Sequence, residues 1–238
     1  SPWVWIDATQ QSAGRQLWGM SLVERQVREM ALRACHRFCL LVTAQTRVAV
    51  EAMRGDLHRL YAVELEIAEV VSVSDIFARL AEEREEIVLL AGDCVYDDRV
   101  LAYILEQGPG VASWERERGA FYFKVEQYAA LRAQQVQNWE GLVAADGVGF
   151  CGREAAALDS YIASLRLTMP AYIYRLGAEE DVRQIDHLMY RRTFKGAIDA
   201  VARYGYYHLV RWITRQLARG ESTPNFYTLL SVFCVWAA

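Results

Sequence analysis

The chain of 238 residues is 53% hydrophobic and 24% charged, with only four prolines. This composition excludes a disordered or low-complexity protein and leaves room for one large or two small folded domains. The net charge of −4 hides an asymmetry, because residues 190–238 carry seven basic against two acidic side chains (+5) and residues 1–189 carry 19 against 28 (−9). A basic tail on an acidic body predicts contact with a membrane surface and argues against nucleic acid as the main partner.

Hydrophobic periodicity and capping signals predict strands that alternate with helices. The first strand is expected at 3–6, and after a polar loop a helix begins at Ser21, which stands in the S-x-x-E capping relation to Glu24. Further strands are expected at 38–43, 60–65, 68–73, 86–93 and 170–176, a hairpin at 111–117 and 120–126, and helices at 46–57, 75–84 (capped by Ser74), 98–107, 153–166 and 178–194. This order predicts an α/β fold with a mixed, mostly parallel sheet and crossover helices.

The run "IVLLAGDCVYDD" ends an apolar strand in Gly92 and Asp93, with Asp97 and Asp98 close behind. Ligands of open α/β sheets bind at the carboxyl ends of the strands. An aspartate at such an end can hold Mg²⁺ while the metal bridges nucleotide phosphates, so Asp93 is the candidate metal ligand. The alternative is that Asp93 caps a turn and Asp98 caps the next helix.

The loop after the first strand, "ATQQSAGRQLWG", is the candidate nucleotide-binding segment. Gly14 would let the backbone approach phosphates, and Arg15 would neutralise their charge. The alternative is an ordinary surface loop, because a phosphate cradle usually needs several free N–H groups.

Cysteine usage is a weaker signal. The five cysteines include Cys35 and Cys39 in "CHRFC", which could share one helix face with His36 between them. A zinc site needs a second ligand pair that the sequence does not provide, so buried, reduced thiols are the favoured interpretation.

The tail changes in character after Phe194. In "KGAIDAVARYGYYHLVRWITRQLARG" the basic and aromatic side chains suit a helix lying on a membrane surface, with Lys195, Arg203, Arg211, Trp212 and Arg215 as the membrane-surface residues. From Phe226 to Ala238 no residue is charged, and these thirteen positions would rise only about 20 Å as a helix. They are interpreted as the start of a truncated transmembrane helix. The alternative is a helix packed against the body.

The sequence from "GMSLVERQVREMALRA" through "FCLLVT" and "SVSDIFARL" to "EIVLLAGDCVYDDRVL" resembles the nucleotidyltransferases of the MobA-like or sugar-nucleotidyltransferase fold. The resemblance implies that Asp93 is the metal-binding aspartate of a "GD" strand end. That family grips the triphosphate with a G-x-G-x-R loop followed by a Pro-Lys segment. This chain has only Gly14 and Arg15 there, without the lysine, which implies a degenerate, non-catalytic relative.

The tail resembles the entry to CDP-alcohol phosphotransferases, several of which carry a cytosolic nucleotidyltransferase-like domain ahead of their membrane domain. The matching runs are "KGAIDAVAR", "WITRQL" and "TPNFYTLLS". That family's catalytic signature is D-G-x-x-A-R, followed by G-x-x-x-D-x-x-x-D. "DAVAR" (199–203) lacks the glycine and the later aspartates, so this chain is not expected to contain the phosphotransferase site.

Together the two resemblances imply three segments: a nucleotidyltransferase-like cytosolic domain at 1–189, a basic amphipathic juxtamembrane helix at 190–222 and a truncated transmembrane helix at 223–238. The intact protein is expected on the cytoplasmic side of the cell membrane, transferring a phospho-alcohol or phosphatidyl group from a CDP-linked donor in lipid synthesis. Mg²⁺ and CTP or the CDP-linked donor are the implied cofactors. The membrane surface and its own membrane domain are the implied partners, and a homodimer is compatible with the sequence. Two alternatives stay open: an active cytidylyltransferase that makes a CDP-alcohol from CTP, and a non-enzymatic soluble domain with a packed C-terminal helix.

Overall fold

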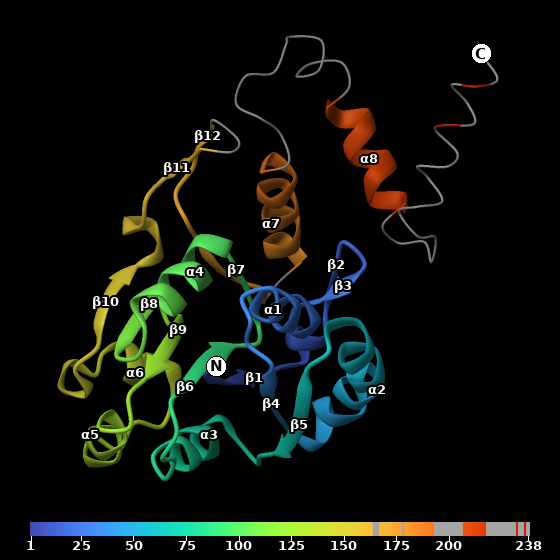
Figure 1. The fold of residues 1–238 in the computed structure, drawn as a ribbon. Helices are drawn as coiled ribbons and strands as arrows, with labels where there is room; N and C mark the ends of the chain where they lie inside the picture. Colours follow the sequence, from blue (N-terminus) through green and yellow to red (C-terminus); the bar gives the residue numbers. More distant parts are fainter. Residues whose placement is uncertain (164–166, 178, 193–206, 218–231, 233–235, 237–238) are drawn as a thin grey trace. The chain divides into compact units, whose positions relative to one another are not determined.

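The computed structural model describes residues 1–163, 167–177, 179–192 and 207–217, together with Val232 and Trp236 (Figure 1). The chain divides into two compact units, Ser1–Gly196 and Ala197–Ala238. The predicted truncated transmembrane helix at 223–238 lies almost entirely outside the described residues. Within the described part, no helix combines the length and the hydropathy that crossing a membrane requires.

A seven-stranded sheet forms the centre of the first unit. Its strands are β1 (Trp3–Asp7), β4 (Arg37–Val42), β5 (Glu64–Glu69), β6 (Ile87–Ala91), β8 (Val111–Glu115), β9 (Arg118–Phe123) and β10 (Cys151–Glu154). They lie in the order β10-β8-β9-β6-β1-β4-β5. β6, β1, β4 and β5 are mutually parallel, β10 is parallel to β8, and β9 runs antiparallel to both β6 and β8. The predicted mixed, mostly parallel sheet is confirmed.

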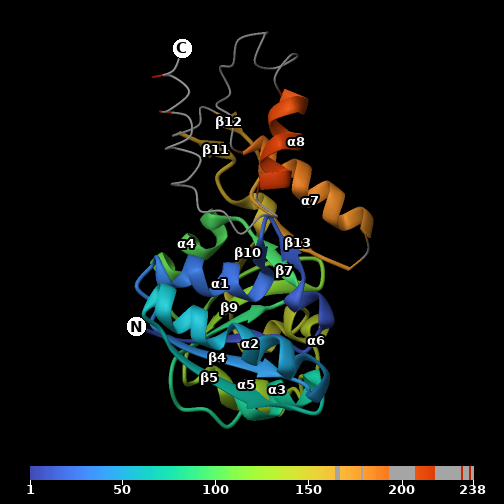
Figure 2. The same ribbon diagram turned by 90° about the vertical axis from the view of Figure 1, so that its right-hand side faces the viewer.

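Helices cover both faces of this sheet (Figures 1 and 2). One layer holds α1 (Leu22–Ala31), α2 (Ala44–Tyr61) and α4 (Asp98–Gln107), and the other holds α3 (Val73–Leu80), α5 (Gln127–Ala133) and α6 (Trp139–Val143). α1 begins as the capping signal predicts, because the Ser21 hydroxyl accepts a hydrogen bond from the Glu24 N–H at 3.1 Å. Coverage on both faces explains why β6 is buried along its whole length.

Shorter elements connect and extend this framework. β2 (Gln16–Leu17) and β3 (Met20–Ser21) form a small hairpin, and β7 (Cys94–Tyr96) pairs antiparallel with β13 (Ile173–Arg175). β11 (Tyr161–Ile162) pairs with β12 (Leu167–Thr168), and α7 (Glu179–Arg191) follows β13. Three 3₁₀ turns lie at Gln11–Gly14, Asp146–Val148 and Ala155–Ala157. In the second unit, α8 spans Tyr207–Leu217.

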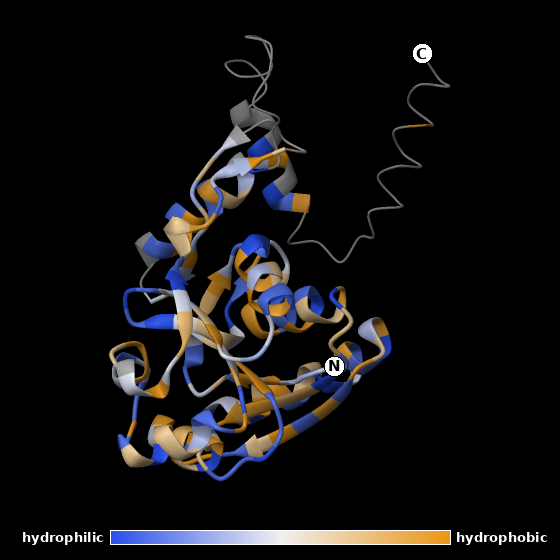
Figure 3. Cartoon of the chain, turned by 60° about the vertical axis from the view of Figure 1, so that its left-hand side comes forward, coloured by the Kyte–Doolittle hydropathy of each residue, from blue (hydrophilic) through white to orange (hydrophobic). Residues whose placement is uncertain are grey.

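Two hydrophobic clusters hold the first unit together. The larger lies around the sheet, whose strands are mostly hydrophobic while the helices are mixed (Figure 3). The smaller contains Leu17, Tyr172 and Ile185, and it packs α7 against the β2–β3 hairpin and the segment before β13. Trp18 in the hairpin turn stacks on Tyr190 of α7, with ring centroids 5.9 Å apart and the planes within 3°. The residues that follow the β1 loop are therefore engaged in anchoring α7.

Four local predictions were wrong. The strands expected at 60–65 and 68–73 are a single strand, β5, because α2 continues to Tyr61 and ends at Ala62 in the left-handed region (φ 52°). α3 is capped by Ser72 and not by Ser74. The helix expected at 153–166 is replaced by β10, a 3₁₀ turn and β11, because pairing with β8 overrides the helical pattern. The span 127–150, for which no element was expected, contains α5 and α6.

Candidate functional site

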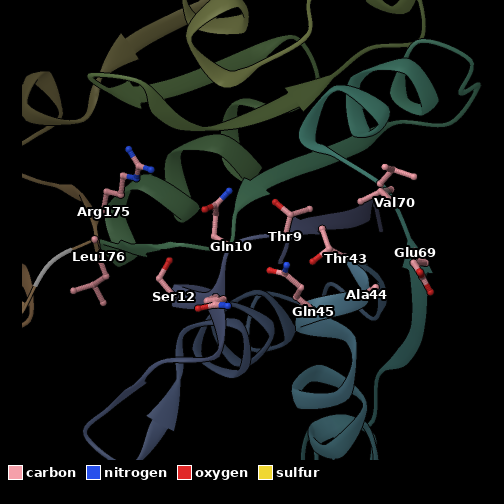
Figure 4. A pocket seen from close by; sticks show the side chains of 13 residues that line it. Thr9, Gln10, Ser12, Thr43, Ala44, Gln45, Glu69, Val70, Arg175 and Leu176 are labelled. Carbon is pink, nitrogen blue, oxygen red and sulfur yellow. The ribbon is translucent and has the colours of Figure 1, made fainter.

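A cavity of about 750 Å³ opens at the carboxyl ends of β1, β4 and β5. Its walls come from four separate segments, 9–12, 43–45, 69–71 and 175–177. Figure 4 shows Arg175 and Leu176 on one side, Glu69 and Val70 on the opposite side, and Thr9, Gln10, Thr43 and Gln45 between them. Parallel strands carry their following loops to the same edge of the sheet, which brings the segments after β1, β4 and β5 together, while 175–177 comes from the end of β13.

The lining of the cavity is polar but nearly neutral. Hydroxyl and amide side chains from the loops after β1 and β4 can both donate and accept hydrogen bonds. The Glu69 carboxylate is paired with Arg47 at 2.6 Å. Among the described residues that line the cavity, Arg175 carries the one positive charge. A ligand with an anionic group would therefore be oriented by Arg175.

The predicted nucleotide-binding residues lie next to this cavity but do not line it. Gly14 ends the 3₁₀ turn, and a side chain there would meet only the Ala49 Cβ at 4.0 Å, so the position does not demand glycine. The Arg15 Nη1 atom donates to the Gly177 carbonyl at 3.4 Å. Several backbone N–H groups of this loop already have partners. That of Thr9 donates to the Asp7 carboxylate, and those of Ala13 and Arg15 donate to carbonyl oxygens of the same loop. This loop differs from an open phosphate cradle.

The predicted metal ligand, Asp93, is the second residue after β6 and is almost fully buried (3% exposed). The Arg118 Nε atom donates to both carboxylate oxygens, at 3.2 and 3.3 Å, and the Arg175 Nε atom donates to Oδ2 at 2.9 Å. Gly92 makes this corner possible: its N–H donates to the Asp7 carbonyl at 3.0 Å, and a Cβ there would lie 2.3 Å from that oxygen. Asp93 therefore sits between two guanidinium groups.

A second buried carboxylate, Asp7, ends β1. Its Oδ2 accepts from Trp139 Nε1 at 2.7 Å, and its Oδ1 accepts from the Thr9 hydroxyl at 2.6 Å. Burial raises the pKa of Asp7, the hydrogen bonds from Thr9 and Trp139 oppose that rise, and the nearby charge of Asp93 adds to it. The Arg118 guanidinium lies over the Trp139 ring, 5.9 Å from its centroid. Trp139 and Arg118 thus connect the two aspartates.

These residues do not fit a divalent metal ion. Mg²⁺ requires oxygen ligands that face it without competing cations, and the oxygens of Asp93 already face two arginines. Across the part of the chain that the structure describes, no group of three or more histidine, cysteine, aspartate or glutamate side chains is placed to hold a metal by protein ligands alone. Cys35 and Cys39 are buried thiols, and burial raises the pKa of Cys39 to about 12.

Four of the five predicted membrane-surface residues belong to the second unit, and Lys195 belongs to the first. Arg211, Trp212 and Arg215 lie on α8, where the Trp212 side chain is 61% exposed. Lys195 and Arg203 fall outside the described residues. The structure therefore brings three of the five predicted residues onto one helix.

Most residues of the site carry no local sequence signal. The structure brings Arg118 and Arg175 to Asp93 from 25 and 82 residues away along the chain. A usable signal did exist for the cavity: Thr9 and Gln10 follow the first strand, and Thr43 and Gln45 follow the second strand of the sheet, so the same side-chain types meet at one edge. No comparable local pattern marks Arg175.

Comparison with known proteins defines the fold. No protein-family model matches the sequence, and no curated protein matches it. Among solved structures, the inositol-1-phosphate CTP transferase from T. maritima aligns with a TM-score of 0.56 at 14% identity, covering 83% of this chain and 98% of that one. UDP-glucose pyrophosphorylase complexed with UDP-glucose aligns with a TM-score of 0.52 at 9% identity, covering 80% of this chain and 99% of that one. A nucleotidyl transferase from Methanothermobacter thermautotroptrophicus aligns with a TM-score of 0.52 at 16% identity, covering 80% of this chain and 98% of that one.

At these identities the likeness shows the fold alone. The first resemblance drawn from the sequence is confirmed at that level, and the comparisons give no support to the second, to CDP-alcohol phosphotransferases. The chain has the nucleotidyltransferase fold, and its alignments cover 98–99% of the length of these three structures.

Proposed function

We propose that the first unit is a nucleotide-binding domain that does not carry out metal-dependent nucleotidyl transfer. The observation that carries the proposal is the position of Asp93, which is buried between Arg118 and Arg175 where a catalytic relative would need an open carboxylate. The fold supports a nucleotide as the ligand, and the arginine pairs argue that the chemistry has been lost.

Nucleotide binding is supported by the cavity itself. Its volume of about 750 Å³ lies within the range of small-molecule sites, and it lies at the strand ends where open α/β sheets bind ligands. The hydroxyls and amides of Thr9, Thr43 and Gln45 suit the donors and acceptors of a base and a ribose. The T. maritima structure is a CTP transferase by its description, so CTP is the first nucleotide to test.

The loss of catalysis has a second support in the β2–β3 hairpin. In the family that the sequence resembles, the segment after the first strand grips the triphosphate through a lysine. Here Leu17 and Trp18 of that segment pack in the smaller hydrophobic cluster and on Tyr190. The hairpin serves to hold α7 in place.

The membrane context rests on the tail. We propose that the intact protein is a CDP-alcohol phosphotransferase of the cytoplasmic side of the membrane, with α8 lying on the lipid surface. The support is the sequence resemblance together with exposed apolar side chains at Trp212, Ile213 and Leu217 beside the basic Arg211 and Arg215. Flotation with anionic vesicles tests this: wild type should float, a Trp212→Ala/Arg215→Glu double variant should not, and equal flotation of both would contradict the role of α8.

Calorimetric titration with CTP, UTP, ATP and GTP tests the nucleotide-binding proposal, and pyrophosphate release from CTP with a phospho-alcohol and Mg²⁺ tests the absence of catalysis. The expected result is binding of at least one nucleotide with no pyrophosphate release. Turnover that disappears in Asp93→Ala would instead establish an active cytidylyltransferase. Absence of binding to any nucleotide would refute the proposed function.

A further inference from the structure

Arg175 connects the cavity with the buried aspartate. Its Nε atom donates to Asp93 Oδ2 at 2.9 Å, and the same residue lines the 750 Å³ cavity (Figure 4). It also lines a second cavity of about 590 Å³ on the side of the β8–β9 turn. A ligand in the first cavity would therefore meet an arginine that already has an anionic partner inside the protein.

The two arginines of Asp93 differ in how firmly they are held. Arg118 bonds to both carboxylate oxygens, lies over Trp139 and has a side chain that is only 13% exposed. Arg175 makes a single bond to Asp93, and its side chain is 49% exposed. Arg175 also forms an ion pair with Glu117, 3.8 Å away and half exposed, where solvent weakens the pair. Arg175 is therefore the partner that can leave.

Departure of Arg175 leaves Asp93 compensated. The buried carboxylate keeps the bifurcated hydrogen bond from the Arg118 Nε–H and its ion pair with that guanidinium, so no isolated buried charge is created. A nucleotide phosphate carries more negative charge than one carboxylate and offers several acceptor oxygens, which lets it bind a guanidinium through two parallel hydrogen bonds. A phosphate chain in the cavity can therefore bind the Arg175 guanidinium in place of the Asp93 carboxylate.

We propose that Asp93 competes with the nucleotide for Arg175. When a nucleotide binds, the Arg175 guanidinium breaks its bond to Asp93 and binds the phosphates instead. The guanidinium then supplies the positive charge that a metal ion would otherwise provide. The ligand class is a nucleoside di- or triphosphate bound independently of Mg²⁺. This inference rests on the proposed nucleotide-binding function. In this proposal Asp93 lowers the affinity for the nucleotide, whereas the sequence had indicated that Asp93 is a metal ligand.

Calorimetric titration of the full chain in EDTA with cytidine and with CTP tests the proposal. The variants are Asp93→Asn, which removes the competing charge and keeps the shape, and Arg175→Gln. The matched control is Arg54→Gln, an exposed arginine on α2 ten residues beyond the cavity wall at Ala44. Asp93→Asn should bind CTP about fivefold more tightly than wild type. Arg175→Gln should bind CTP at least roughly tenfold more weakly. The control should match wild type, and cytidine should bind equally to all four proteins.

The outcomes separate the two proposals. If CTP binds wild type but Asp93→Asn binds it no more tightly, or Arg175→Gln binds it as wild type does, the competition is refuted while the nucleotide site stands. A requirement for Mg²⁺ in wild type would refute it as well. If no protein binds CTP, UTP, ATP or GTP, with or without Mg²⁺, the nucleotide site itself fails. Arg175→Gln keeps the Asp93–Arg118 pair, so unchanged CTP binding by this variant refutes the proposal even if Asp93→Asn does not fold.

Discussion

Replacing Asp97 by alanine should destabilise the first unit more than any other single aspartate substitution near α4. The Asp97 side chain is completely buried between β7 and α4. Its Oδ1 accepts from the Arg99 N–H at 3.0 Å, which caps α4, and the Arg99 guanidinium bonds to both oxygens at 2.8 and 2.9 Å. Arg192, just after α7, lies 3.4 Å away. One carboxylate therefore holds the start of α4 and the end of α7.

The size of the effect follows from what is left behind. Arg99 and Arg192 have side chains only 19% and 20% exposed, so both lose a partner in a largely buried setting. Breaking a buried ion pair from one side costs about 3–5 kcal/mol, and losing an N-cap costs about 1 kcal/mol. Because Asp98 and two backbone carbonyls still bind these arginines, we expect a loss of about 4 kcal/mol in the free energy of unfolding. That loss corresponds to a fall of roughly 10 °C in Tm.

Urea unfolding followed by tryptophan fluorescence measures this loss. The matched control is Asp98→Ala, because the neighbouring aspartate also pairs with Arg192 but is half exposed. Its expected loss is below about 1 kcal/mol. Equal unfolding free energies for the two variants would show that the buried carboxylate does not hold α4 and α7 together.

Three further predictions concern the core and the thiols. Gly92→Ala should cost about 3 kcal/mol of unfolding free energy, because its Cβ would lie 2.3 Å from the Asp7 carbonyl oxygen. In the control Gly55→Ala, within α2, the added Cβ would have no atom within 4 Å, and the variant should gain about 0.5–1 kcal/mol. An unchanged unfolding free energy for Gly92→Ala would contradict the close approach. Burial raises the pKa of Asp7 above its usual 3.8, so the folded chain holds that proton more tightly than the unfolded chain. The unfolding free energy of wild type relative to Asp7→Asn should therefore be greatest below about pH 4 and fall as the pH rises through the folded pKa of Asp7. Urea unfolding of both proteins across that pH range measures the difference, and a difference that grows with pH would contradict the raised pKa. Iodoacetamide at pH 8 should label the exposed Cys151 and spare Cys39, whose pKa burial raises to about 12; peptide masses showing equal labelling of both in the folded protein would contradict the burial of Cys39.

Much of the sheet could be predicted from local sequence, and the reason is physical. The apolar runs 38–42 and 87–91 are short and rich in β-branched or bulky residues, which favours strands covered on both faces, and Ser21 with Glu24 indicates where α1 begins. The predictions failed where the sheet decides the structure. Residues 153–166 look helical in isolation, yet β10 pairs with β8 there.

The candidate site was harder to predict because its key contacts join distant segments. Asp93 was found through a local pattern, the glycine-aspartate pair at the end of an apolar strand. Its actual partners come from β9 and β13, and nothing near Arg118 or Arg175 in the sequence indicates an ion pair. A local motif can therefore locate a residue correctly and still leave its chemistry open, because tertiary neighbours decide whether a carboxylate faces a metal or an arginine.

Crystals of the full chain soaked with CTP and MnCl₂, with anomalous diffraction from manganese, would show whether Arg175 or a metal ion on Asp93 binds the phosphates. Mn²⁺ is chosen because it takes the same oxygen ligands as Mg²⁺ and scatters strongly enough to be located. The expected result is density for CTP in the cavity at the ends of β1, β4 and β5, with its phosphates on Arg175 and no manganese peak in contact with Asp93. A manganese ion bound to the Asp93 carboxylate, with both arginines displaced, would contradict the account.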